Sequence, residues 1–235
     1  MPYFSPFFID YWYLILVVPA LLISVWAQFK VKSTYAKYSD KPVSNGMTGA
    51  DVTRYIQQVN GIHTDIQAVA GELSDHFDPR TNVVRLSEGV YGRSTVAAVG
   101  IAAHETGHAL QHAEGYGPVK LRTAMVPVTN FASGLSPILI LLGIVMSMDA
   151  LAYAGIALFS MATLFQLVTL PVEFNASARA VAALESSGQF TEDELKGVKK
   201  VLTAAALTYV AALLVSLMTL LRLILIVGGN GRRRR

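Results

Sequence analysis

The stretch AAHETGHALQH, residues 102–112, holds three of the five histidines of this 235-residue chain. His104 and His108 are four residues apart, so on a helix they lie one above the other on the same face. Two imidazole nitrogens placed in this way can bind one metal ion at about 2.0–2.1 Å each. The preceding VAAVGIAA is apolar and small, so we expect a buried helix, where unpaired histidine and glutamate side chains are costly. The pattern therefore predicts a metal site.

Glu105 follows the first histidine and is expected to point beside the metal, where a base can take a proton from metal-bound water. Zinc lowers the pKa of such a water to about 7. Gly107 costs about 1 kcal/mol inside a helix relative to alanine, a cost that a helix used only for packing has little reason to accept. The chain has no cysteine, so zinc has to be held by histidine and carboxylate.

A catalytic zinc takes three protein ligands and leaves one position open. Glu173, in LPVEFNASARA (170–180), is the best candidate for the third ligand, because it follows an apolar segment that returns the chain to the side of the HExxH helix. Pro171 can start a new helix there and so fix the direction of Glu173. The alternative is an interfacial carboxylate, which the dipole at a helix start favours.

The composition indicates an integral membrane protein. Apolar residues make up 53% of the chain and charged residues only 15%, whereas soluble domains carry about a quarter of charged residues. The first apolar segment has aromatic residues at both ends and no cleavage site after it, so we expect a retained anchor with its N-terminus outside. Four segments are long enough to span a bilayer: Tyr11–Phe29, about 126–148, 150–170 and 201–227, the last interrupted by Arg222.

The second and third apolar segments are expected to form a hairpin with a tight turn at Asp149, so residues 31–125 and 172–200 lie on one side of the membrane. Lysine and arginine flank the segments on that side, and the positive-inside rule places it in the cytoplasm. The C-terminal RRRR then falls outside if the fourth segment spans fully. Either the fourth segment is re-entrant, or the tail is a late and weak topology signal.

We therefore expect an α+β integral membrane protein with about four transmembrane helices and a small zincin-like catalytic unit with a short β-sheet. The expected parts are an N-terminal transmembrane anchor (1–30), the catalytic unit with the HExxH helix (31–125), a transmembrane hairpin (126–171), a third-ligand helix and loop (172–200), and a fourth transmembrane helix with a basic tail (201–235).

Local patterns place the elements of the catalytic unit. Thr48 with Asp51 is a capping-box variant that starts a helix, and Asn60-Gly61 ends it. Residues 62–73 and 82–87 alternate enough to form strands, with a turn at 78–82 between them. Ser94 is expected to cap the helix that carries the motif. The strand NVVRLS (82–87) is either an edge that holds a peptide substrate by β-augmentation or an interior strand.

These stretches, together with MTGADV (47–52), DHFDPRTNVVRLSEGVY (75–91) and AQFKVKSTYAKYS (27–39), resemble the YugP-like neutral zinc metallopeptidases of bacterial membranes over nearly the whole chain. The chain is more distantly similar to HtpX-like membrane gluzincins, which carry HExxH and then a glutamate in an E-x-x-A-D pattern after a transmembrane hairpin. The resemblance implies that Glu173 is the third ligand. Ser177 stands where that pattern has aspartate, so either Asn175 or Ser177 is expected to orient a ligand.

The remaining polar residues carry weaker expectations. His112 lies a further turn along, about 6 Å beyond His108, and is either a polar helix end or a substrate contact. His76 is either an oxyanion donor near the cleft or an ordinary hairpin residue. Arg179 is expected to pair with a carboxylate of the site or with a lipid phosphate. His63 is expected at the surface, and Asp149 is not expected to be a ligand.

The expected function is that of a membrane-embedded zinc metalloendopeptidase, which hydrolyses peptide bonds of membrane or membrane-proximal proteins. Zn²⁺ is held by His104, His108 and Glu173, and Glu105 is the general base. The alternative is a zinc-bound scaffold or adaptor without proteolysis. Expected partners are a protein or peptide substrate, membrane lipid, and a membrane protein or a second copy of the chain, but no nucleic acid. The expected location is a bacterial cell membrane, crossed several times, with the catalytic side cytoplasmic.

Overall fold

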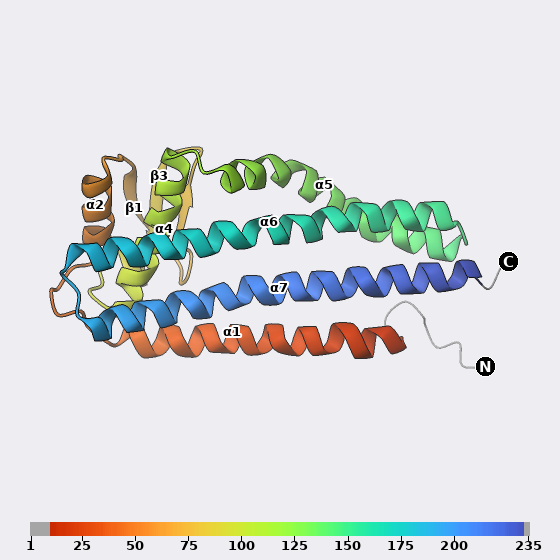
Figure 1. Ribbon diagram of the computed structural model, residues 1–235, viewed down its shortest axis with the longest axis horizontal. Helices are drawn as coiled ribbons and strands as arrows, with labels where there is room; N and C mark the ends of the chain where they lie inside the picture. Colours follow the sequence, from red (N-terminus) through yellow and green to blue (C-terminus); the bar gives the residue numbers. More distant parts are fainter. Residues whose placement is uncertain (1–9, 233–235) are drawn as a thin grey trace. The chain divides into compact units, whose positions relative to one another are not determined.

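The computed structural model describes residues 10–232 and divides into two compact units (Figure 1). We call the first the bundle unit; it comprises Met1–Ala27, Leu121–Leu170 and Thr208–Arg235. We call the second the HExxH unit; it comprises Gln28–Lys120 and Pro171–Leu207. Residues 1–9 of the expected anchor and 233–235 of the basic tail lie outside the described residues.

Four helices of the described chain are long and apolar enough to span a membrane, which confirms the expected α+β membrane protein with a small sheet. The first candidate span, Tyr13–Ser39, consists of a short π-helix (Tyr13–Val17) and α1 (Val18–Ser39). The others lie in α5 (Gly117–Val145), α6 (Asp149–Ser187) and α7 (Glu192–Arg232).

One expected helix start is wrong. Pro171 lies inside α6 and does not start a new helix, because long apolar helices tolerate proline when neighbouring groups satisfy the freed backbone. Arg222, the charged residue that interrupts the fourth apolar segment, lies inside α7, which continues past it. Its guanidinium Nε donates to Asp10 Oδ2 at 2.8 Å within the bundle unit, and its Cζ lies 5.2 Å from the centre of the Tyr13 ring. The charge is therefore paired, and the helix accommodates it.

In the bundle unit, α5 and α6 approach closely through small residues. A Cβ added to Gly143 would lie 2.4 Å from the backbone nitrogen of Ala152, so only glycine fits there. Ser136 donates from its hydroxyl to the carbonyl of Gly155 at 2.8 Å. Small residues and interhelical hydrogen bonds of this kind hold apolar helices together in the absence of a hydrophobic driving force.

The HExxH unit contains α2 (Gly49–Asn60), α3 (Glu88–Tyr91), α4 (Val96–Ala113) and a three-stranded sheet. The strands are β1 (Asp65–Val69), β2 (His76–Asp78) and β3 (Val83–Ser87), in the order β1-β3-β2. β1 is parallel to β3, and β2 is antiparallel to it.

The local signals of the HExxH unit are largely confirmed. Thr48 and Asp51 form the capping box of α2, and Gly61 ends that helix at φ 63°. The expected cap of α4 is wrong by one residue: Thr95 accepts from the backbone N–H of Ala98, whereas Ser94 donates its hydroxyl to the carbonyl of Gly46. Of residues 82–87, Val83–Ser87 form the central strand β3, so the edge next to α4 belongs to β2.

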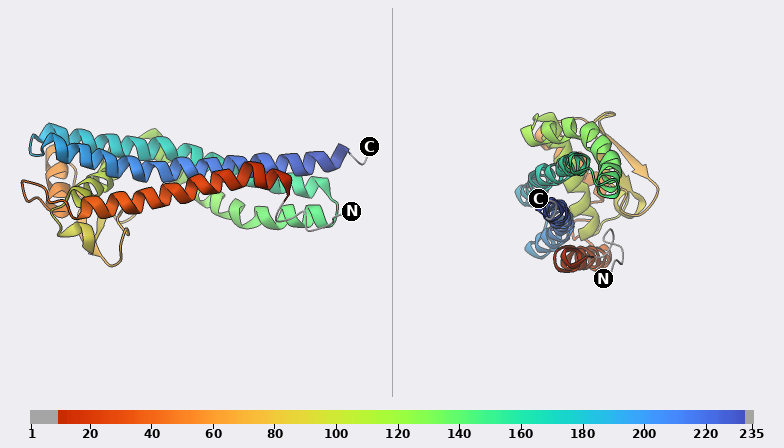
Figure 2. Two further views of the ribbon diagram at one scale, coloured as in Figure 1. Left: turned by 90° about the horizontal axis from the view of Figure 1, so that it is seen from below. Right: turned by 90° about the vertical axis from the view of Figure 1, so that its right-hand side faces the viewer.

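α4 is the centre of the HExxH unit, and its two faces enter two different cores. One face packs with α2, α6 and α7 in a cluster that includes Val52, Ala103 and Leu184. The other face packs on β3 through Val84 and Leu86. Figure 2 shows the sheet on the side of α4 away from α6 and α7. Being covered on both sides, α4 presents its polar groups from a fixed position.

Candidate metal centre

Three side chains converge on one point between α4 and α6. His104, His108 and Glu173 each offer a ligand atom, and these atoms lie within 4.8 Å of one another. The carboxylate Oε2 of Glu173 is 3.5 Å from Nε2 of His104 and 3.5 Å from Nε2 of His108. Two ligand atoms at about 2.0–2.1 Å from a tetrahedral zinc are themselves about 3.4 Å apart. The donor set and its spacing therefore fit one zinc ion.

Each histidine is oriented by a hydrogen bond at its other ring nitrogen. His104 Nδ1 lies 3.1 Å from the hydroxyl of Ser177, and His108 Nδ1 lies 3.0 Å from Oε1 of Gln111. An amide oxygen can only accept, so His108 carries its proton on Nδ1 and leaves Nε2 free to bind a metal. The same tautomer in His104 lets the Ser177 hydroxyl accept.

Gln111 belongs to the hydrogen-bond network of the candidate site, and the sequence analysis missed it. Its side chain is fully buried, and its Nε2 donates to the carbonyl of Val172 at 2.8 Å and to Oδ1 of Asn175 at 2.9 Å. Gln111 thus accepts from His108 through its side-chain oxygen and donates through its nitrogen to the backbone next to Glu173. In the sequence it resembles any polar residue of an exposed helix end, so no local pattern marks it.

The two candidates for the role of the missing aspartate both take part in this network. Ser177 contacts His104, while Asn175 contacts Gln111 and accepts from Nε of Arg179 at 2.8 Å. Arg179 also forms a two-pronged ion pair with Glu114, at 2.7 and 2.8 Å. Arg179 therefore pairs with a carboxylate, but this is Glu114 at the end of α4 and not a carboxylate of the three-residue group. The network ties the C-terminal end of α4 to α6.

Gly107 permits the close contact between α4 and α6. A Cβ built at this position would lie 2.6 Å from the carbonyl oxygen of Ala176, which is backbone and cannot move aside alone. The sequence argument that packing gives little reason for Gly107 is therefore wrong. The glycine is needed because the backbones touch here, and this contact lets Glu173 reach the two histidines.

Glu105 is held by the sheet. The backbone N–H of Phe77, in the edge strand β2, donates to Oε2 of Glu105 at 3.1 Å. Glu105 is half-buried, beside the three ligands but outside their group. A backbone donor carries no side-chain signal, so the sequence could not identify this contact.

The local charges favour a cation. Burial by itself lowers the pKa of His108, but the hydrogen bond and charge of Glu173 and the charge of Glu105 outweigh burial and raise the pKa above its usual value. The negative field that retains a proton on an imidazole also attracts a divalent metal ion.

Among the described residues, the group that can hold a metal contains three ligands and no fourth. His112 is exposed and stacks obliquely near Phe77, with ring centres 5.7 Å apart. His76 is exposed on β2, and its Nδ1 lies 2.8 Å from the carbonyl of Ser74. His63 is exposed, and Asp149 belongs to the bundle unit as the first residue of α6. Three protein ligands are typical of a catalytic zinc site, which leaves the fourth coordination position open, whereas a structural zinc site has four protein ligands.

Residues 13–228 match a family described as "Putative neutral zinc metallopeptidase". The chain belongs to this family. A protein of Bacillus subtilis (strain 168) named "Putative membrane protease YugP" is 52% identical to it over 215 residues, which are 91% of this chain and 96% of that protein. No solved structure matches the chain. The resemblance drawn from the sequence is confirmed, and membership of a zinc peptidase family agrees with the two-histidine, one-carboxylate donor set.

The role of Gln111 gives a first prediction. Gln111→Leu removes the acceptor for His108 at nearly constant volume, and loss of such a partner lowers metal affinity about 10- to 100-fold. Zinc affinity is measured by chelator competition on the purified full chain. Gln57→Leu is the matched control, since Gln57 is buried on α2 and bonds Thr64. Equal zinc affinity in both folded variants would contradict the assignment.

The contact at Gly107 gives a second prediction. Gly107→Ala forces α4 and α6 apart, so we expect the chain to lose about 1–3 kcal/mol of stability, even though alanine favours the helix by about 1 kcal/mol, and to lose zinc as well. Gly100→Ala on the same helix is the control, because its Cβ would meet the side chain of Val198 at 3.3 Å and no backbone atom closer than 3.7 Å. Denaturant unfolding and zinc content are the measurements. An effect of the same size in both variants would show that helix separation is not the cause.

Proposed function

We propose that this chain is a membrane-embedded zinc metalloendopeptidase of the gluzincin type, with His104, His108 and Glu173 as ligands and Glu105 as general base. The observation that supports it most strongly is the meeting of Glu173, from α6, with both imidazoles of α4 at 3.5 Å. Glu173 is 65 or more positions away from the two histidines in the chain. The packing of α4 against α6 nevertheless brings its carboxylate to a distance from both imidazoles that suits ligands of one zinc ion.

A zinc ion held by these residues would supply a Lewis acid for the scissile carbonyl and would make water a nucleophile near neutral pH. Glu105 accepts the proton that this water gives up and delivers it to the leaving amine. Its Oε2 is engaged by the backbone N–H of Phe77, so Oε1 is the oxygen that carries the proton. The strand contact fixes the carboxylate and stops it from turning onto the metal.

We assign the peptide substrate to the edge strand β2. The strand at residues 82–87, which the sequence offered for this role, is interior to the sheet. β2 pairs only with β3 among the described strands, and Phe77 lies opposite Val84. The N–H of Phe77 points away from β3 toward Glu105, so its carbonyl points to the same side. That carbonyl can accept from a substrate N–H, which would place an extended peptide beside the base. Recognition by backbone predicts weak side-chain specificity.

The substrates are proposed to be membrane or membrane-proximal proteins, because α1, α6 and α7 each carry a candidate span and contribute residues to the HExxH unit. The proposed location is the plasma membrane of a bacterium, crossed by four helices. The basic flanks of the HExxH unit place it in the cytoplasm by the positive-inside rule.

Replacing the base tests the proposal. Glu105→Gln keeps the size of the side chain and the metal ligands but removes the proton acceptor. Protein N-termini are mapped in the membrane proteome of cells with the wild-type chain and cells with the variant, at matched expression. We expect a set of new N-termini to disappear in Glu105→Gln and to persist in Glu72→Gln, an exposed glutamate on the loop before β2.

Zinc content of the purified variants completes the test. Coincident maps for wild type and a zinc-loaded, folded Glu105→Gln would overturn the proteolytic function and favour a zinc-bound scaffold or adaptor. Loss of the N-termini together with zinc would show only that the metal centre had been damaged, and Glu105→Asp, which retains a carboxylate, would then decide.

A further inference from the structure

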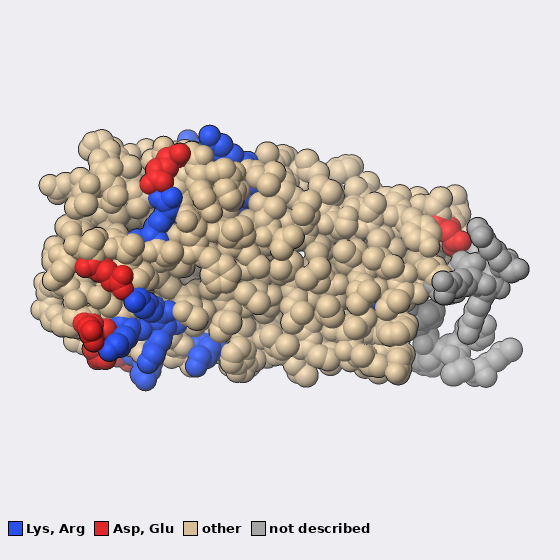
Figure 3. Space-filling view, in the orientation of Figure 1, with Lys and Arg blue, Asp and Glu red and all other residues tan. Residues whose placement is uncertain are grey.

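A basic pocket lies between α1 and α7 within the HExxH unit. It has a volume of about 550 Å³ and contains none of the candidate metal ligands. Lys30 and Lys37 line it from α1, and Lys199 and Lys200 line it from α7. Hydroxyl groups and the apolar side chains of Ala204 and Leu207 complete the wall. Figure 3 shows that lysine and arginine gather over the adjoining ends of these two helices.

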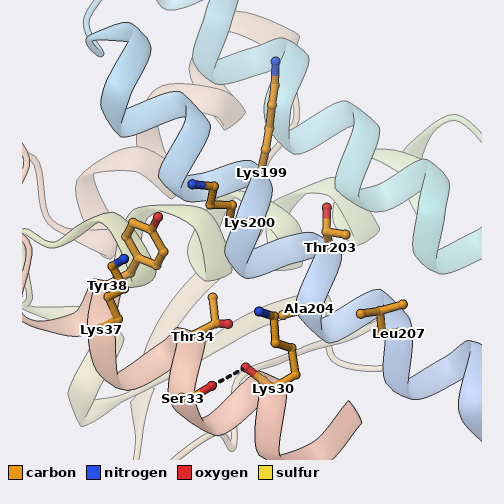
Figure 4. Close-up of a pocket in the computed structure, with 10 residues that line it drawn as sticks. All are labelled: Lys30, Ser33, Thr34, Lys37, Tyr38, Lys199, Lys200, Thr203, Ala204 and Leu207. Atoms are coloured by element: carbon orange, nitrogen blue, oxygen red, sulfur yellow. Dashed lines mark hydrogen bonds between the residues drawn. The ribbon is translucent and has the colours of Figure 1, made fainter. Parts of the chain in front are cut away.

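Among the described residues, only one of these four ammonium groups, that of Lys199, forms an ion pair; Lys200 lies within the electrostatic reach of Asp193, which is itself paired with Lys41. Lys199 forms an ion pair with Glu185 at 2.6 Å, and Figure 4 shows its side chain extending away from α1. Among the residues that the structure describes, Lys30, Lys37 and Lys200 have no carboxylate within 4.0 Å. Figure 4 shows these three distributed along the trough between α1 and α7. The positive charges around the pocket repel each other. An anion bound in the pocket would offset this repulsion and would therefore be stabilised.

The pocket lies where both helices change from apolar to basic. On α1 the apolar run ends at Phe29 and Lys30 follows; on α7 Lys200 precedes the apolar run that starts at Val201. The helices run antiparallel here, since Lys41 pairs with Asp193 at 2.6 Å while the lining residues extend to Lys30 and Leu207. Lysines at the ends of membrane helices are at headgroup depth.

We propose that this pocket binds the phosphate of an anionic phospholipid from the leaflet that faces the HExxH unit. Lysine recognises phosphate as a point charge, and basic pockets between membrane helices bind anionic headgroups. The apolar residues toward Leu207 continue the pocket in the direction of the hydrocarbon, where a lipid places its acyl chains. A free anion or an acidic peptide would use the lysines but not this apolar end. The proposal does not rest on proteolytic activity.

The test uses the purified full chain in detergent. Bound lipid is counted by native mass spectrometry during titration with dioleoyl phosphatidylglycerol, with phosphatidylcholine of the same chains, and with inorganic phosphate. The variant Lys30→Gln/Lys37→Gln/Lys200→Gln removes the three unpaired ammonium groups. The control Lys32→Gln/Lys120→Gln/Lys196→Gln removes the same charge from exposed lysines outside the pocket. The variant with arginine at positions 30, 37 and 200 keeps the charge, and unfolding curves establish that each variant is folded.

We expect one phosphatidylglycerol to bind the wild type at least tenfold more tightly than phosphatidylcholine. The glutamine variant should lose this preference, while the control and the arginine variant keep it. Three outcomes would overturn the proposal: equal binding of both lipids, an equal loss in the control variant, or inorganic phosphate binding as tightly as the lipid. Unchanged phosphatidylglycerol binding in the glutamine variant would overturn the proposal as well.

Discussion

The metal centre depends on one backbone contact, that of Gly107 on α4 with the carbonyl of Ala176 on α6. Each helix alone holds only part of the candidate ligand set: α4 carries the two imidazoles, with the proposed base Glu105 beside them, and α6 carries the carboxylate. A side chain at residue 107 would keep the helices farther apart, and Oε2 of Glu173 could not lie 3.5 Å from both Nε2 atoms. Glycine destabilises a helix by about 1 kcal/mol relative to alanine, but the close approach of α4 and α6 requires glycine at this position.

The contact also explains why the polar network is buried. Gln111 and Glu173 are almost completely enclosed, and buried polar groups destabilise a protein unless they are bonded. Gln111 satisfies this by joining His108 to the carbonyl of Val172 and the amide of Asn175. The bonds that fix the histidine tautomer therefore also lock α4 against α6. Metal geometry and helix packing are parts of one arrangement, so a change in either alters both.

The sequence predicted the features that depend on local spacing. The face shared by His104 and His108, the capping box at Thr48, and the four apolar segments all follow from helical periodicity or composition. Glu173 was chosen because it follows the apolar segment that returns the chain to the side of the HExxH helix, and the family resemblance supported that choice. The parts that could not be predicted depend on long-range contacts. Gln111 meets Val172 across 61 positions, and Glu105 meets a backbone N–H, which no residue type reveals.

Proline and lysine show how a correct local pattern can still support a wrong or incomplete conclusion. Pro171 has the residue type of a helix start, yet α6 passes through it, because its neighbours settle whether a helix continues. In the sequence, Lys30, Lys37 and Lys200 served only as evidence for membrane topology. That interpretation does not require these lysines to lie near one another. Antiparallel packing of α1 and α7 brings them around one hollow. Charges that orient a helix during insertion can thus serve afterwards as a binding site, since both roles require positive charge at the boundary of the hydrocarbon.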